Sequence, residues 1–501
     1  MPQPFRAKIF EVEQGHNEVV LNEERAVSLG LSHFDRVMLR GRGKKVAAIV
    51  DFSAKLIKYD EVGLFEEVAE QLGVKNGEIV SLEPIHRPNS LDYIKKKLDN
   101  QTLKTHEIDL IIQDLMQEKL AATDLAAFIA AIYTNGMNTE ETASLTNAIC
   151  KSGDVLEFED KNVVSAHSIG GVSGDRVTMV IVPIMASLGI KIPKTASRAI
   201  SSASGTADAM EVLTNVTLDV KQIRKVVMKT NGCLVWGGAV HLASADDKLI
   251  RIRNPLRLDP KPLLLSSILA KKKAEGARFV IIDIPVGRGA KIQHIDEGRE
   301  LAKSFEQLGS HLGMKVQCII SDGSEPLIPT IGPALEARAV LETLEQKHMN
   351  LLLEKSCLMC GVLLHLVKKI PKEEGYRIAL EQVKNGKALE KLQEIMVAQG
   401  GKRKKSSEIV IGPLRATIRA TERGKIGHVD NKAVSKLCRM LGAPQSKEAG
   451  MIILATKGQH VEKGQPVAEL VSNSKEKLEY ALRQVPQLKL FEVERIIIDV
   501  V

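Results

Sequence analysis

The chain has few aromatic residues and few cysteines. Phe, Trp and Tyr make up only 3% of its 501 residues, so base-stacking platforms for single-stranded nucleic acid are poorly supplied. Its six cysteines are scattered, as reduced core thiols usually are. Cys357 and Cys360 form a CxxC pair in an apolar helical stretch, but there is no second pair. Because a zinc site needs four ligands, we favour buried helix packing for this pair over a metal or redox role.

Long apolar runs and spaced metal ligands are also missing. No stretch reaches transmembrane length, and the segment Met1–Arg6 lacks the apolar core of a signal peptide. We therefore expect a cytoplasmic protein with no membrane partner and no metal. The net charge of +8, with so few aromatics, favours a small anionic substrate over a polymer.

Changes of pattern along the chain predict a multidomain α/β protein. Short apolar runs alternating with turns in residues 1–84 predict a small N-terminal β-barrel-like domain. Residues 85–160 read as consecutive amphipathic helices, a helical domain that we expect roughly 242–275 to complete. Strands alternating with helices in 161–405 predict a central α/β phosphate-binding domain with a mainly parallel sheet. Strand and turn signals in 406–501 predict a separate C-terminal α+β domain.

The segment Lys194–Glu211 concentrates hydroxyl groups and small residues ahead of a predicted helix start. Thr206 or Asp208 is predicted to cap that helix. Small side chains allow backbone N–H groups to reach a phosphate oxygen, and Arg198 adds a fork of donors suited to phosphate. The alternative is an ordinary polar loop before a well-capped helix.

A second segment, Ser168–Asp175, lies a few tens of residues upstream. Gly170 and Gly171 permit positive φ and a close backbone approach to an oxyanion, although paired glycines also mark plain turns. The two loops lie on either side of one predicted helix, so together they indicate a phosphate cradle.

Two basic runs have a simpler interpretation. Arg40–Lys45 is typical of a solvated hairpin turn, and Lys402–Lys405 of a solvated loop. They also motivate a remote alternative, a non-catalytic protein that binds nucleotides or nucleic acid. A steep salt dependence of oligonucleotide binding, without base release, would support it.

Several motifs occur in the order found in one family: His167–Asp175, Lys194–Glu211, Gly232–Val240, Leu258–Pro260, Ser267–Lys272 and Ile284–Lys291. Over nearly its whole length the chain resembles the nucleoside phosphorylases of the thymidine and pyrimidine type. Within them it is most similar to the archaeal-type AMP phosphorylases, including an N-terminal domain that ordinary thymidine phosphorylases lack.

The resemblance implies a pentosyltransferase of nucleotide salvage and AMP catabolism. AMP and inorganic phosphate would give adenine and ribose 1,5-bisphosphate, with CMP and UMP as further substrates. Phosphate would be a co-substrate, and no cofactor is implied. Because relatives assemble as dimers, we expect a homodimer or a larger homo-oligomer. A thymidine (pyrimidine nucleoside) phosphorylase is the main alternative.

The resemblance also implies the roles of individual residues. Asp259 falls where the proton donor to the departing base is placed. Ser168 and Thr178 match positions that hold the attacking phosphate. The roles of His167, Lys271 and Arg253 stay open. The positions implied to contact the nucleotide and phosphate are Gly171, Ser197, Arg198, Ala199, Ile200, Ser201, Ser202, Thr206, Ser267 and Lys291.

The chain departs from these relatives at a few positions. Ala166 stands where thymidine phosphorylases carry a lysine, as expected for the AMP type. His241 and Ser244 replace an expected asparagine and proline. Arg253 could approach the base in the manner of the pyrimidine enzymes' arginine, so base preference is left open.

Overall fold

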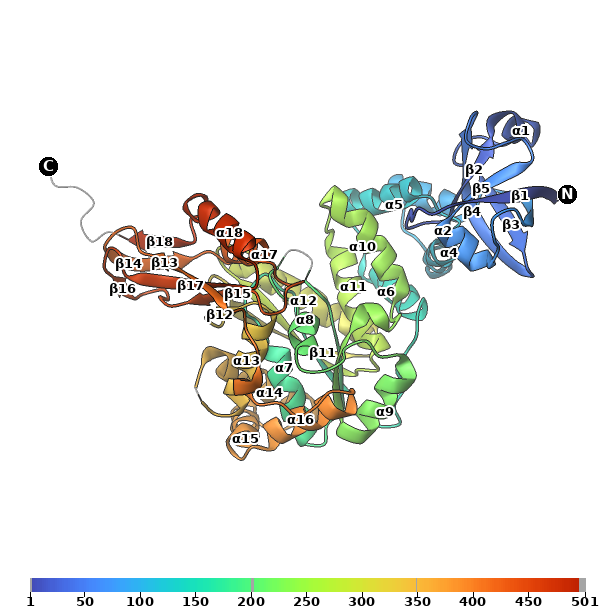
Figure 1. The fold of residues 1–501 in the computed structure, drawn as a ribbon. Coiled ribbons are helices and arrows are strands. Elements are labelled where there is room, and N and C mark those ends of the chain that lie inside the picture. The colour runs from blue at the N-terminus through green and yellow to red at the C-terminus, as the bar shows by residue number, and fades with distance from the viewer. Residues whose placement is uncertain (1, 200–201, 348, 495–501) are drawn as a thin grey trace. The chain divides into compact units, whose positions relative to one another are not determined.

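The structure, a computed structural model, describes residues 2–199, 202–347 and 349–494, and it divides into two compact units (Figure 1). One unit comprises Met1–Gly153 and Ala243–Ser267. The other comprises Asp154–Leu242 and Ile268–Val501.

The N-terminal region forms a closed barrel with strand order β1-β5-β2-β4-β3-β6, which confirms the predicted β-barrel. Gly63 interrupts the apolar pattern of strand β5. The glycine is needed there, since a Cβ at Gly63 would lie 2.5 Å from the Phe10 ring. Arg42 and Gly43 turn the predicted hairpin, and both have positive φ. The elements are β1 (Gln3–Phe10), β2 (Glu18–Asn22), α1 (Glu23–Ser28), β3 (Arg36–Gly41), β4 (Lys44–Ser53), β5 (Glu61–Phe65), α2 (Glu66–Leu72) and β6 (Ile79–Ile85).

Helices follow the barrel in the same unit, as the amphipathic spacing predicts. Leu125, Phe128 and Ile132 lie on the buried side of α5, whereas Tyr133 is exposed. The buried Arg36 of the barrel donates to Lys119 O at 2.9 Å and pairs with Asp124. The helices are α3 (Ser90–Leu98), α4 (Thr105–Met116), α5 (Ala122–Asn135), α6 (Thr139–Lys151), α10 (Ser244–Leu256) and α11 (Lys261–Ala274), the last of which continues past Ser267.

The second unit contains the predicted parallel sheet, in the order β11-β10-β7, and a parallel pair of β8 with β9. Helix α14 buries Cys357 and Cys360 completely, and burial raises the pKa of the Cys357 thiol to about 12. Both cysteines therefore pack in the core, as expected. The elements are β7 (Val164–Ser168), α7 (Val177–Ser187), β8 (Ile192–Ala196), α8 (Thr206–Glu211), α9 (Val220–Thr230), β9 (Gly232–Trp236), η1 (Gly237–Ala239), β10 (Phe279–Val286), α12 (Ile295–His311), β11 (Lys315–Asp322), α13 (Pro333–Leu344), α14 (Leu351–Lys368), α15 (Lys372–Lys384) and α16 (Lys387–Ala398).

The C-terminal region adds two small antiparallel sheets, ordered β12-β15-β17-β13 and β16-β14-β18, with helices α17 and α18. Its hydrophobic core also contains Ala203, which comes from the loop before α8 in the same unit. This region therefore shares its core with a segment predicted to bind phosphate. The elements are β12 (Thr330–Ile331), η2 (Ser406–Glu408), β13 (Leu414–Arg419), β14 (Gly424–Val429), α17 (Asn431–Met440), β15 (Gly450–Ile453), β16 (His460–Val461), β17 (Pro466–Ser472), α18 (Lys475–Leu488) and β18 (Phe491–Glu494).

Candidate active site

The predicted loop Ser168–Asp175, here the first loop along the chain, follows the carboxyl end of β7, and its Gly170 and Gly171 have φ of +83° and +99°. A Cβ on Gly171 would lie 3.1 Å from the backbone nitrogen of Lys291, so glycine permits this approach. Lys291 lies in the loop after β10, which pairs in parallel with β7. The structure thus brings together Gly171 and Lys291, two residues predicted to bind substrate.

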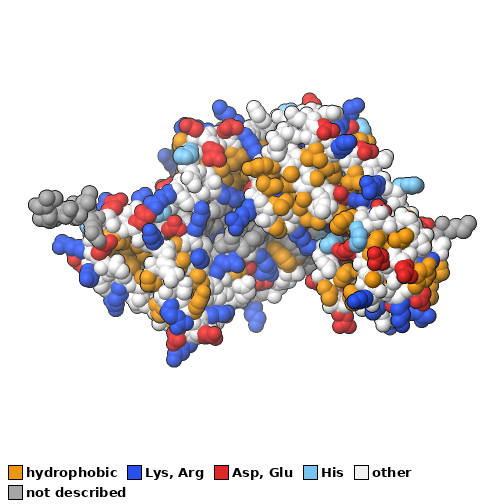
Figure 2. Space-filling model, turned by 90° about the horizontal axis from the view of Figure 1, so that it is seen from above, with side chains coloured by type: hydrophobic (Ala, Val, Ile, Leu, Met, Phe, Trp, Pro, Cys, Tyr) orange, Lys and Arg blue, Asp and Glu red, His pale blue; other side chains and the backbone are white. Residues whose placement is uncertain are grey.

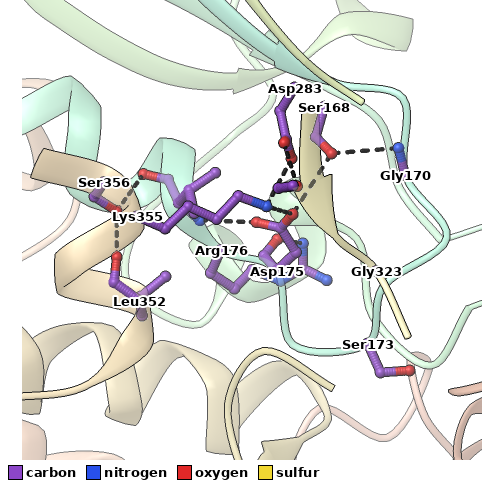
Figure 3. A network of polar contacts seen from close by, with 12 residues as sticks. Ser168, Gly170, Ser173, Asp175, Arg176, Asp283, Gly323, Leu352, Lys355 and Ser356 are labelled. Atoms are coloured by element: carbon purple, nitrogen blue, oxygen red, sulfur yellow. Dashed lines mark hydrogen bonds and ion pairs between the residues drawn. The ribbon is translucent and has the colours of Figure 1, made fainter. Parts of the chain in front are cut away.

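A network of hydrogen bonds and ion pairs includes residues of the first loop (Figure 3). The Ser168 hydroxyl accepts the Gly170 N–H at 3.4 Å and donates to Asp175 at 3.5 Å. The Lys355 amine bridges the carboxylates of Asp175 and Asp283 at 3.1 and 2.7 Å. Burial raises the pKa of Asp283, with a further contribution from Asp175 that Lys355 opposes. Largely buried ion pairs therefore hold the Asp175 end of this loop in place.

The second loop along the chain, within the predicted segment Lys194–Glu211, connects β8 to α8, and Asp208 of α8 bonds to its backbone. The buried Asp208 carboxylate accepts the backbone N–H groups of Ala199 at 2.8 Å and Gly205 at 3.0 Å. The predicted N-cap is wrong, because Gly205 occupies that position and Asp208 is the third helical residue. A Cβ on Gly205 would lie 2.6 Å from Ser197 O, so only glycine fits this close turn. Ala199, predicted to contact the substrate, therefore uses its backbone N–H for a hydrogen bond to Asp208.

The other predicted residues of this loop are placed as follows. Ile200 and Ser201 lie outside the described residues. Ser197 and Ser202 are exposed, and the Ser202 hydroxyl donates to Ser204 O at 3.1 Å. Exposed hydroxyls at these positions can meet a ligand.

Arg198, predicted to bind phosphate, is held by two carboxylates. It donates to both oxygens of Glu211 at 2.7 and 2.5 Å and to Asp208 at 3.2 Å, and its guanidinium lies 4.7 Å from the Trp236 ring centre. Hydrogen bonds from Arg198 lower the pKa of Glu211 to about 2, with help from Lys447. A guanidinium has five N–H groups, and these contacts use three of them.

Arg176 connects the two loops, a role that the sequence analysis missed. Its guanidinium donates to Asp175 O at 2.7 Å, Ser204 O at 2.7 Å and the Thr206 hydroxyl at 3.2 Å, and it pairs with Glu336 at 2.5 Å. Only 9% of its side chain is exposed. Because the Thr206 oxygen accepts from Arg176, its own hydrogen is left to point elsewhere. The position of Arg176 directly after the first loop was the available signal.

A buried cluster lies beneath the strands that lead into the loops. The Glu275 carboxylate accepts from Ser165 at 2.6 Å, Thr195 N at 2.9 Å and Lys272 at 2.7 Å. Burial lowers the pKa of His167 well below its usual value, and the nearby lysines, Lys194 foremost, lower it further. This lowered pKa favours the neutral imidazole, which fits a structural role for His167.

Asp259 and Ser267 belong to the first unit. Asp259 lies between α10 and α11, its side chain is 46% exposed, and it accepts a hydrogen bond from Arg253 at 2.8 Å. The hydroxyl of Ser267 donates to the buried carboxylate of Asp246 at 2.7 Å. Arg253 thus contacts the predicted proton donor, which gives it a partner that sequence could not identify.

Two negative findings concern the described part of the chain. Within residues 2–199, 202–347 and 349–494, no helix is long and apolar enough to cross a membrane. The same residues contain no group of three or more His, Cys, Asp or Glu side chains that could hold a metal ion.

Comparison with protein families defines the class of the molecule. Residues 91–153 match the helical bundle domain of the glycosyl transferase family, and residues 160–389 match the a/b domain of that family. Among solved structures, anthranilate phosphoribosyltransferase from Thermus thermophilus has a TM-score of 0.54 at 16% identity, covering 62% of this chain and 99% of that one. This likeness shows a shared fold. The two family matches show that the chain is an enzyme of the glycosyltransferase class.

Curated relatives narrow the class further. AMP phosphorylases from Methanococcus vannielii and Methanocaldococcus jannaschii are 40% and 41% identical to the chain over 497 residues, covering 99% of this chain and 98% of each relative. The AMP phosphorylase of Pyrococcus furiosus is 40% identical over 498 residues and 99% of both chains. The chain belongs to the AMP phosphorylase family.

Proposed function

We propose that the chain catalyses the phosphorolysis of AMP. Inorganic phosphate attacks C1′, the glycosidic bond breaks, adenine leaves with a proton, and ribose 1,5-bisphosphate forms. The observation that carries the proposal is the joining of two predicted anion loops by Arg176, with Lys291 against Gly171, in a chain similar to AMP phosphorylases over 99% of its length.

The chemistry requires binding of two phosphate groups, and the second unit offers suitable donors. Lys291 supplies a point charge next to the glycine turn. Thr206, oriented by Arg176, directs its hydroxyl hydrogen toward an anion. The remaining N–H groups of Arg198 suit a second phosphate oxygen. Donors fixed in advance are effective because they need little reorganisation when charge develops.

Departure of a purine is easier when its ring is protonated, and Asp259 is the proposed proton donor. Exposure of its side chain allows it to exchange protons with solvent. The ion pair with Arg253 orients its carboxyl group. To act as an acid it must take up a proton, which negatively charged substrate phosphates would favour.

Base release measured by chromatography tests this function. The protein would be incubated with AMP, CMP, UMP, adenosine and thymidine, each with and without inorganic phosphate. Phosphate-dependent release of adenine from AMP, unaffected by EDTA, is expected, since we propose catalysis without a metal or an organic cofactor. Turnover of thymidine but of no nucleotide would contradict the proposal. A nucleic-acid role is not favoured, because aromatic residues that could stack on bases make up only 3% of the chain. Figure 2 shows both basic and acidic side chains on one face of the molecule.

We also propose that the chain works as a homodimer or a larger homo-oligomer in the cytoplasm. Light scattering coupled to size-exclusion chromatography measures the assembly directly. A mass near that of one 54.8 kDa chain would contradict it.

A further inference from the structure

Lys447, in the C-terminal region between α17 and β15, contacts the same two carboxylates that hold Arg198. Its amine lies 3.3 Å from Asp208 and 2.7 Å from Glu211. Its backbone is fixed as well, because Ala334 N donates to Lys447 O at 2.9 Å. About a quarter of the side chain, 27%, is exposed. Lys447, more than 200 positions after the second loop, therefore pairs with the carboxylate that accepts the loop's backbone N–H groups.

The charges in this cluster balance only when Lys447 is counted. Asp208 and Glu211 carry two negative charges, and Arg198 and Lys447 carry two positive charges. Without Lys447, the guanidinium of Arg198 would be the single cation among the described residues that pairs with both carboxylates. Its attraction to them would then compete more strongly with attraction to a phosphate oxygen.

Two further contacts connect the C-terminal region with the predicted loops. Ala203, within the second loop, is buried in the C-terminal hydrophobic core. In the first loop, Ser173 donates its N–H to Asn431 Oδ1 at 2.9 Å and its hydroxyl to Asn431 O at 3.2 Å. The same region thus contacts described residues of both loops, in ways that do not depend on Lys447.

We propose that Lys447 is a positioning residue for phosphate binding. It neutralises the excess negative charge of Asp208 and Glu211, keeps the closure of the second loop intact, and leaves donors of Arg198 for the anion. The inference rests on the proposed function only in taking that anion to be phosphate.

Calorimetric binding of inorganic phosphate to the full chain tests the inference, using Lys447→Met, Lys447→Arg and a matched control, Lys475→Met. Lys475 is 85% exposed and lies 3.9 Å from Glu479, one turn along α18. We expect the Kd for phosphate to rise about tenfold in Lys447→Met, a typical size for coupling between sites. Lys447→Arg should restore most of the affinity because it keeps the charge, and Lys475→Met should match the parent protein.

A double variant separates positioning from general support of the fold. Arg198→Met should weaken phosphate binding, and adding Lys447→Met to it should weaken binding little more, because Lys447 acts through Arg198. Steady-state rates with AMP should show a raised KM for phosphate with kcat changed less than about twofold.

Several outcomes would overturn the inference. An unchanged Kd in Lys447→Met would do so, as would full additivity of the two substitutions or a loss that Lys447→Arg does not rescue. If the parent protein binds phosphate but releases no adenine from AMP, the proposed function fails and the binding test of Lys447 still stands. If it binds no phosphate, both fail.

Discussion

The two loops proposed to bind phosphate and the turn that carries Asp259 are built in different ways. Arg176, Asp208 and Lys355 are buried or nearly so, and they tie the loops with hydrogen bonds and ion pairs. Asp259 is half exposed and pairs with Arg253. The difference fits the proposed roles. A phosphate group presents the same oxygens in every catalytic cycle and suits fixed donors, whereas a proton donor must regain a proton from solvent after each cycle.

The largest expected effect is at the exposed turn. Asp259→Asn keeps the size and part of the hydrogen bonding of the side chain but removes its acidic proton. We expect kcat with AMP to fall by about 10²- to 10⁴-fold, the usual contribution of a positioned acid. Binding of AMP, measured by calorimetry, should change little, because the loops still hold its phosphate.

Asp296→Asn is a matched control for that variant. Asp296 is 87% exposed and pairs with Arg299 one turn along α12, so its removal should leave kcat unchanged. Turnover near that of the parent protein in Asp259→Asn would remove Asp259 from its proposed role, and the contrast between loop and turn would lose its catalytic meaning.

A smaller effect is expected when the link between the loops is weakened. Arg176→Lys keeps a positive charge for Glu336, but one amine cannot reach the four groups that the guanidinium contacts. We expect the KM for phosphate to rise about tenfold, with a smaller change in kcat. The control is Arg338→Lys on α13, whose half-exposed side chain pairs with Glu342. If Arg176→Lys instead lowered kcat about tenfold and left the KM for phosphate unchanged, Arg176 would not act through phosphate binding.

Much of this arrangement was predictable from sequence. The alternation of apolar runs predicted the barrel, the helices and the parallel sheet, because burial on one face imposes a period on the chain. Gly170 and Gly171 marked the first loop, since few residues other than glycine adopt their φ. The contact of Gly171 with Lys291 followed from no local pattern, because it depends on the pairing of β7 with β10.

What sequence could not supply were contacts across long separations. Arg176 and Glu336 are 160 positions apart, and Ser173 and Asn431 are 258 apart. Likewise, Asp208 looked like an N-cap because local spacing cannot show that Gly205 folds against Ser197. A sequence shows which donors and acceptors are present but not which of them pair. The two loops could therefore be predicted, but the contacts that hold them in place could not.

The smallest expected effect concerns pH and the second loop. Arg198 lowers the pKa of Glu211 to about 2 from an ordinary value of 4.5. A depressed carboxyl pKa stabilises the fold fully above pH 4.5, and that contribution disappears as the pH falls toward 2. Glu211→Gln should therefore lower the free energy of unfolding at pH 7, by about 1 kcal/mol or less because the ion pair is partly exposed. Urea unfolding of both proteins at pH 7, 4.5 and 3 should show the difference shrinking with acid. A difference that stays constant over this range would mean that Glu211 supports the loop by packing, and that the loop owes its fixed shape to contacts other than charge.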